Sequence, residues 1–146
     1  MPRPLAQFLI VLVLVSLLSS HALAMKPFLD RARKVYDLEG KLAKCTLCHD
    51  VDESKKEEPK GNNLDDYGMD FENHPLMKPL LHVDENYKYS KAELKTFEQV
   101  MKLLEGVDSD KDGATNLEEL QLGTLPGRKD SVPSAEALAK LRGKKR

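Results

Sequence analysis

Residues 45–49 read Cys-Thr-Leu-Cys-His, and the rest of the chain is best interpreted outward from this pentapeptide. It holds both cysteines of a 146-residue chain, so a small domain built on several disulfides is excluded. Two thiols three positions apart can bond the two vinyl-derived carbons at one porphyrin edge. The adjacent imidazole then lies under the ring, where a nitrogen can coordinate iron. The spacing therefore predicts a covalently attached haem c.

Four other interpretations of the cysteine pair remain open from the sequence, and the simplest is a chance occurrence of so short a motif. The other three are different uses of the two thiols. A thioredoxin-like redox dithiol is one, although the usual β-α-β surroundings are missing. Half of a zinc site is another, but the chain has no second cysteine pair and few spare histidines. The third is a short disulfide.

The first 24 residues have the features of a secretory signal. Arg3 supplies a positive start, residues 9–18 are uncharged and apolar, and Ala22-Leu23-Ala24 suits a signal peptidase. We expect cleavage there and a periplasmic or secreted product, with no stable membrane insertion afterwards; an uncleaved anchor is the alternative. Export agrees with haem c, which is attached on the far side of the membrane.

Composition narrows the range of functions. The chain has 23 basic and 24 acidic residues, a formal charge of −1, which argues against a general nucleic-acid binder. Aromatic residues make up only 5% and tryptophan is absent, so the side-chain core is thin. A haem would enlarge that core. The side chains expected to surround it are Leu47, Phe71, Leu76, Leu80, Phe97 and Met101.

Apolar periodicity predicts helices at 26–39 and 91–105, the second opened by the capping box Ser90-x-x-Glu93. Shorter helices are expected at 117–122 and 135–141, followed by a frayed basic end at 142–146. Residues 50–66 are polar and predict a surface loop. Pro75 and Pro79 argue against a continuous helix over 67–81. No convincing strand pattern is found, so the predicted class is mainly α.

This arrangement resembles small c-type cytochromes over about residues 28–105. A helix precedes the pentapeptide, an amphipathic helix follows well downstream, and residues 61–68 (GNNLDDYG) resemble a segment of some exported mono-haem proteins. The resemblance implies a helical domain around one haem. It also implies thioether bonds from Cys45 and Cys48 and proximal iron ligation by His49.

The sixth iron ligand is less determined. The family most often uses a loop methionine, which raises the reduction potential relative to histidine. Met77 fits best because it lies in a loop stiffened by two prolines. An open or water-bound iron is also possible, and Met101 is expected in the core. The other candidates are Met69, His74 and His82.

Residues 108–119 (DSDKDGATNLEE) match the EF-hand-type loop D-x-D-x-D-G-x5-E. Calcium takes six to eight hard oxygens, and alternate carboxylates turn inward as such a loop curls. Gly113 permits the sharp turn. The alternative is a solvent-exposed acidic turn that binds no ion. The predicted ligands are Asp108, Asp110, Asp112, the Ala114 carbonyl, Asn116 and Glu119.

The loop resembles the lone calcium loops of dockerins and thrombospondin type 3 repeats. Thr115 occupies the position where paired EF-hands carry an aliphatic residue, and the chain has no second loop. A sensor needs a partner loop to open against, so we expect a structural site. An affinity of about 10⁻⁴ to 10⁻³ M is typical of extracellular modules.

The expected organisation is a signal peptide (1–24), a haem domain (25–105), a calcium loop with a short exit helix (106–127) and a charged tail (128–146). The expected function is electron transfer with a redox partner protein, by a carrier with one haem c and one Ca²⁺ rather than an enzyme. The alternatives are a calcium-stabilised secreted binding module, a haem-based sensor, or a small peroxidase with an open iron position.

Overall fold

The structure is a computed structural model and describes residues 26–51, 63–81 and 87–144. The predicted signal at 1–24, most of the predicted loop at 50–66, and His82 lie outside these ranges. The mainly α class is confirmed. The described residues contain no strand, and their one isolated β-bridge is antiparallel, between His49 and Leu64. The α-helices are α2 (Lys26–Tyr36), α3 (Asp66–Asn73), α4 (Lys91–Leu104), α5 (Asn116–Leu122) and α6 (Ala135–Lys144).

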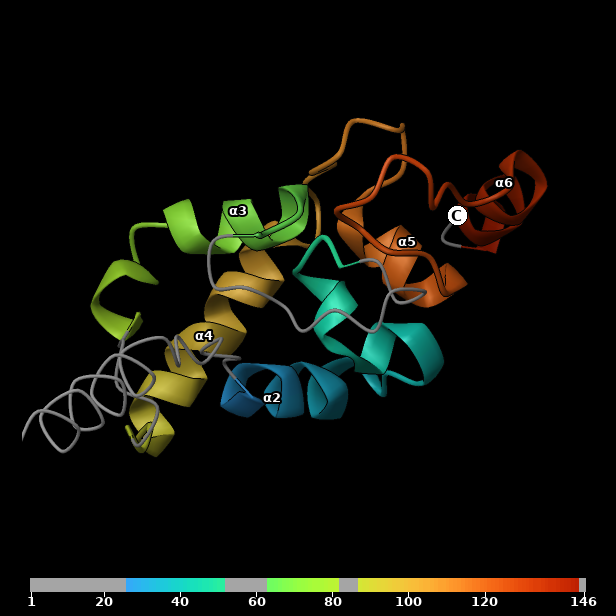
Figure 1. Cartoon of the computed structure of the whole chain (residues 1–146). Coiled ribbons are helices and arrows are strands. Elements are labelled where there is room, and N and C mark those ends of the chain that lie inside the picture. Colours follow the sequence, from blue (N-terminus) through green and yellow to red (C-terminus); the bar gives the residue numbers. More distant parts are fainter. Residues whose placement is uncertain (1–25, 52–62, 82–86, 145–146) are drawn as a thin grey trace, which may run out of the picture.

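Helices α2, α3 and α4 enclose the core (Figure 1). Phe28 of α2 stacks on Phe97 of α4 with ring centroids 4.4 Å apart. Phe97 also stacks on Phe71 of α3 at 5.2 Å. Tyr67 meets the edge of Phe71 at 4.9 Å, so one aromatic row joins three helices. Such pairs add to the stabilisation that burial alone gives.

The two longest predicted helices are present, but both end earlier than predicted. Ser90 and Glu93 form the predicted capping box of α4, which closes one residue early at Leu104. Helix α2 ends at Tyr36 instead of residue 39. Asp37 and Gly40 both have positive φ, at 52° and 58°, and the chain cannot continue a right-handed helix through them.

Helix α3 was not predicted, although the interruption by proline was. Asp65 caps it, since its carboxylate accepts a hydrogen bond from the Gly68 N–H at 2.8 Å. The helix stops at Asn73, two residues before Pro75. A 3₁₀ turn, η4 (Lys78–Leu80), follows after the proline.

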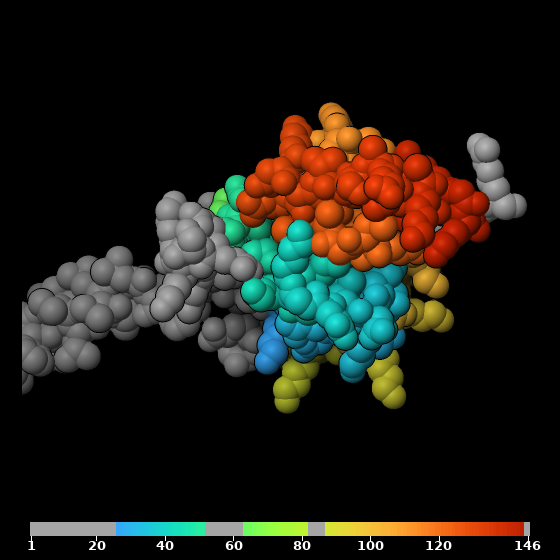
Figure 2. Space-filling view, turned by 90° about the vertical axis from the view of Figure 1, so that its right-hand side faces the viewer, coloured from blue at the N-terminus to red at the C-terminus, as the bar shows by residue number. Residues whose placement is uncertain are grey.

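The C-terminal end is attached and not frayed at Arg142. Its guanidinium makes two hydrogen bonds of 2.8 Å to the Glu118 carboxylate and one of 3.0 Å to the Gly113 carbonyl oxygen. Helix α6 buries no residue of its own, so these contacts tie it to α5 and the loop before it. Figure 2 shows the C-terminal segments covering one side of the molecule. The predicted end of this helix, 141, is extended to Lys144.

None of the helices among the described residues combines the length and apolar character that a membrane span requires.

Candidate functional site

A cavity of about 360 Å³ lies between α2, α3 and α4. The predicted attachment residues Cys45, Cys48 and His49 all line it. Most of the remaining wall is apolar and aromatic. The main contributors are Phe28, Leu29 and Ala32 of α2, Tyr67, Gly68 and Phe71 of α3, and Phe97 and Met101 of α4. The volume lies in the range of small-molecule and cofactor sites.

A tight turn presents the pentapeptide to this cavity. Cys45–Leu47 form a 3₁₀ helix, η2, and the N–H groups of Cys48 and His49 donate to the Cys45 carbonyl oxygen at 3.2 and 3.0 Å. The two sulfurs do not form a disulfide. Burial, with a further contribution from Asp65, raises the pKa of the Cys48 thiol well above its usual range. Because no disulfide joins them, both sulfurs remain free to bond a group in the cavity that they line.

The candidate methionine and histidine ligands fall into two groups, those that line the cavity and those that do not. Met77 is 1% exposed and lines the cavity, and its N–H donates to the His74 carbonyl oxygen at 2.9 Å. Met101 is equally buried and lines the same cavity. Met69 is 44% exposed, and neither it nor His74 lines the cavity. Met77 and Met101 therefore line the same cavity as His49.

The predicted apolar surround is only partly correct. Leu47, Phe71, Phe97 and Met101 line the cavity as expected. Leu80 is buried but belongs to the core beside the cavity. Leu76 is 43% exposed, which contradicts the expectation, because the turn after Pro75 directs it outward.

Gly68 lets α3 approach the pentapeptide closely. A Cβ at this position would overlap the Cys48 carbonyl oxygen and lie 3.1 Å from Leu64 Cδ2. The Cys48 carbonyl oxygen also accepts a hydrogen bond from the Asp65 N–H at 3.1 Å. The start of α3 is thereby fixed against the turn that carries both thiols.

We expect Gly68→Ala to destabilise the protein by about 1–3 kcal/mol, toward the upper end because the obstacle is backbone. Chemical denaturation measures this loss. Gly106→Ala is the matched control, since no atom lies within 4 Å of its added Cβ. Equal stability of the Gly68 and Gly106 variants would contradict the close approach.

A buried carboxyl group, that of Asp65, lies next to the contact between Gly68 and Cys48. Asp65 is 6% exposed, and burial raises its pKa to about 7 despite the N–H of Gly68 and the charge of Arg128. A Cβ on Gly127 would overlap the Asp65 carboxyl group and lie 2.6 Å from the Tyr67 nitrogen. The segment after α5 is thus packed directly on the first turn of α3.

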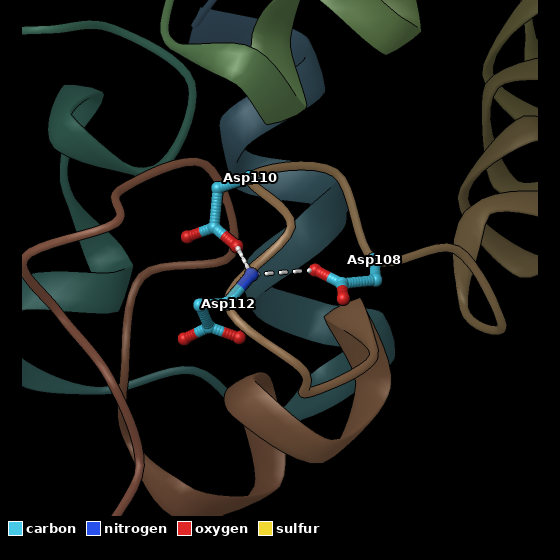
Figure 3. Close-up of side chains that lie close together, drawn as sticks. All are labelled: Asp108, Asp110 and Asp112. Atoms are coloured by element: carbon cyan, nitrogen blue, oxygen red, sulfur yellow. Dashed lines mark hydrogen bonds between the residues drawn. The ribbon is translucent and has the colours of Figure 1, made fainter.

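A second candidate site is the acidic loop between α4 and α5. Oxygens of Asp108, Asp110 and Asp112 lie within 4.8 Å of one another, and Figure 3 shows their carboxylates gathered around the Asp112 nitrogen. The Asp112 N–H donates to Asp108 at 3.1 Å and to Asp110 at 3.2 Å. Gly113 has a φ of 100°, as the predicted turn requires.

Glu119 is not part of that close group of three aspartates, but it is a buried carboxyl group whose oxygens have no hydrogen-bond partner. It is 0% exposed, and neither of its carboxylate oxygens has a hydrogen-bond partner. One oxygen each of Asp110 and Asp112 is also buried without a partner. Burial, followed by the charges of Asp110 and Asp112, raises the pKa of Glu119 to about 8. Buried carboxylates without partners are costly, and a bound cation removes that cost.

The remaining predicted ligands are also in this loop, but Asn116 has a further use. Its side-chain N–H groups donate to the Leu104 carbonyl oxygen at 2.8 Å and to Ser109 Oγ at 2.9 Å, and its Oδ1 accepts from the Ser109 N–H at 3.3 Å. Asn116 therefore ties the loop to the end of α4. Ala114 is 1% exposed, and its N–H donates to Asp112 at 2.8 Å.

Ser109 is a residue that sequence reasoning missed. Its hydroxyl donates to the Asp70 carboxylate of α3 at 2.7 Å. No periodicity or motif links residues 39 positions apart, so no sequence signal indicated this contact.

Comparison with known protein families, curated proteins and solved structures finds no match to this chain. Its function is therefore inferred from the cavity and the acidic loop themselves.

Proposed function

We propose that this chain is an exported electron-transfer protein that carries one covalently attached haem c and one structural calcium ion. The observation that carries the proposal is the shared cavity. Both thiols of the pentapeptide, the neighbouring imidazole and a buried methionine line one apolar space of about 360 Å³. A flat apolar group bound through two sulfurs fits this set of donors.

Two rival uses of the cysteines have less support. A zinc half-site needs further ligands, yet the described residues place no third His, Cys, Asp or Glu in a metal-binding group with Cys45 and Cys48. A thioredoxin-like dithiol normally sits beside a sheet, and the described ranges contain no strand. A disulfide is also not formed.

Each residue around the cavity has a definite role in the proposal. Cys45 and Cys48 would hold the group by thioether bonds, and His49 would supply a nitrogen ligand to its iron. Met77 would supply a sulfur ligand, which favours the reduced state relative to histidine. The aromatic row of α2, α3 and α4 excludes water. A bound haem c would supply one iron that accepts and releases a single electron.

Calcium is the second part of the proposal, and it is supported by the burial of Glu119, the last predicted ligand of the loop. Three aspartates alone are an ordinary acidic turn. A fully buried glutamate without hydrogen-bond partners for either oxygen is unusual in a folded protein. A hard divalent cation satisfies such oxygens best. The position of the loop between α4 and α5 suits a structural ion.

The proposal is tested by intact-mass spectrometry of the full chain, expressed in a host that matures c-type cytochromes. We expect exported protein that begins after Ala24, with a mass equal to residues 25–146 plus one haem. A pyridine haemochrome assay should give one haem c per chain. The bare polypeptide mass would refute the haem proposal, and an uncleaved chain in the membrane fraction would refute signal cleavage and support the membrane-anchor alternative.

The axial ligand is tested by Met77→Ala, with Met101→Ala as the matched control from the same cavity. We expect Met77→Ala to lose the weak long-wavelength methionine–iron band and to lower the reduction potential, because a sulfur ligand raises it. Met101→Ala should keep the band. The reverse pattern would transfer the role to Met101.

Binding of carbon monoxide separates the carrier from a sensor or peroxidase. Two protein ligands on the iron leave no free position, so we expect slow or no binding in the wild-type protein and rapid binding in Met77→Ala. Rapid binding in the wild type would favour the open-iron alternative.

A further inference from the structure

We infer that cation binding at the acidic loop restrains α3, and with it one wall of the cavity, through the hydrogen bond from Ser109 to Asp70. The inference rests on the calcium part of the proposed function and adds a physical connection between the two sites. It holds whether or not the cavity is filled by haem.

The cation loop is joined to α4 and α3, and the end of α4 beside it is joined to α2. It leaves directly from α4, whose Phe97 and Met101 line the cavity. Glu105, at the end of α4, accepts a hydrogen bond from the Tyr36 hydroxyl of α2 at 2.9 Å. The contact with α3 is different, because it comes from inside the cation loop itself.

The hydrogen bond between Ser109 and Asp70 connects the cation site to the cavity wall. Ser109 stands between Asp108 and Asp110 and donates to Asp70 at 2.7 Å. This is the length of a strong hydrogen bond from a hydroxyl to a carboxylate. Asp70 is the immediate neighbour of Phe71, which lines the cavity. A change in the order of the loop therefore reaches α3 without passing through the core.

Asn116 fixes Ser109 from the other side. Its Nδ2 donates to Ser109 Oγ at 2.9 Å and to the Leu104 carbonyl oxygen at 2.8 Å. The Ser109 hydroxyl thus accepts from Asn116 and donates to Asp70. This chain runs from the end of α4 through the loop to α3, and its members are held in place only while the loop keeps its fold.

Without a cation, the acidic side chains destabilise the folded conformation of the loop. Glu119 is buried and unpartnered, and Asp108, Asp110 and Asp112 repel one another at close range. Opening the loop relieves these costs and releases Ser109 from Asp70. A bound cation reverses the balance. By linkage, a ligand that orders the cavity wall must also raise the affinity of the loop for the cation.

The test is hydrogen–deuterium exchange of the full chain with calcium and with chelator. We expect calcium to slow exchange of the α3 amides by at least about fivefold, the lower end of usual coupling between sites. Asp70→Ala leaves every loop residue in place and should abolish the effect on α3 while α5 remains protected. Asp70→Asn keeps an acceptor for Ser109 and should retain most of the effect, which separates the hydrogen bond from the charge.

Each outcome decides between the proposals. Calcium that protects α5 but not α3 in the wild type overturns the inference and leaves the calcium site intact. Persistent protection of α3 in Asp70→Ala also overturns it. Calorimetry showing no calcium binding overturns both the ion site and the inference. Absence of haem in a sample that still shows calcium-dependent protection of α3 refutes only the haem proposal.

Discussion

A chain with both Cys45 and Cys48 changed to alanine should carry no haem and should lose cooperative thermal unfolding. The reason is the size of the space left unfilled. Without haem, the apolar and aromatic wall of a space of about 360 Å³ faces water instead of the cofactor, which costs hydrophobic stabilisation. The whole stability of a small domain is only about 5–15 kcal/mol, so such a loss is large in proportion.

Far-ultraviolet circular dichroism during heating measures this effect, with intact mass as the check for haem. The double change to serine is the matched control, because it preserves the size of both side chains and also prevents attachment. The two variants should behave alike if the missing haem is the cause. A sharp, native-like melting transition in haem-free protein would show that the side chains alone suffice.

Glu119→Gln should abolish the rise in melting temperature that calcium produces in the wild type. At a calcium concentration 100 times the dissociation constant, binding contributes about 2.7 kcal/mol. For a domain of this size that corresponds to roughly 10 °C. The calcium-free variant should be no less stable than the calcium-free wild type, since glutamine removes a buried carboxylate that lacks any partner.

Glu118→Gln is the matched control for this change. Glu118 is adjacent in sequence, but its carboxylate pairs with Arg142 at 2.8 Å, which lowers its pKa to about 2. The control should keep the full response to calcium and weaken the contact with α6, while glutamine still offers an acceptor for the Thr115 N–H that Glu118 caps. A full calcium response in Glu119→Gln, measured by scanning calorimetry, would count against the proposed ligand set.

Local signals in the sequence predicted most of the helices. Ser90 and Glu93 opened α4, and Gly123, with a φ of 78°, ends α5 where expected. Helix α3 was not predicted from the sequence, because Gly68 weakens the helical periodicity and two prolines follow closely. Its start does carry a signal, Asp65, whose carboxylate caps the Gly68 N–H. That signal is weak alone, because aspartates are as common in loops as at helix starts.

Contacts between segments far apart in the chain could not be predicted from the sequence. Motif spacing and the resemblance to c-type cytochromes point to the cysteine pair and Met77, but neither predicts that these residues line one cavity. Leu76 and Leu80 illustrate the limit, since both are apolar and neither lines it. The Ser109–Asp70 hydrogen bond has no local signature at all. Such pairs depend on how helices pack, which periodicity does not encode.

The anchoring of α6 through Arg142 has a practical consequence for producing the protein. An affinity tag fused after Arg146 would start only four residues from a side chain that contacts both Glu118 and Gly113. Residues added there lie close in sequence to the contact that ties α6 to α5 and the acidic loop, and losing that contact would change the stability that a calcium titration reports. A cleavable fusion, removed before measurement, avoids this interference.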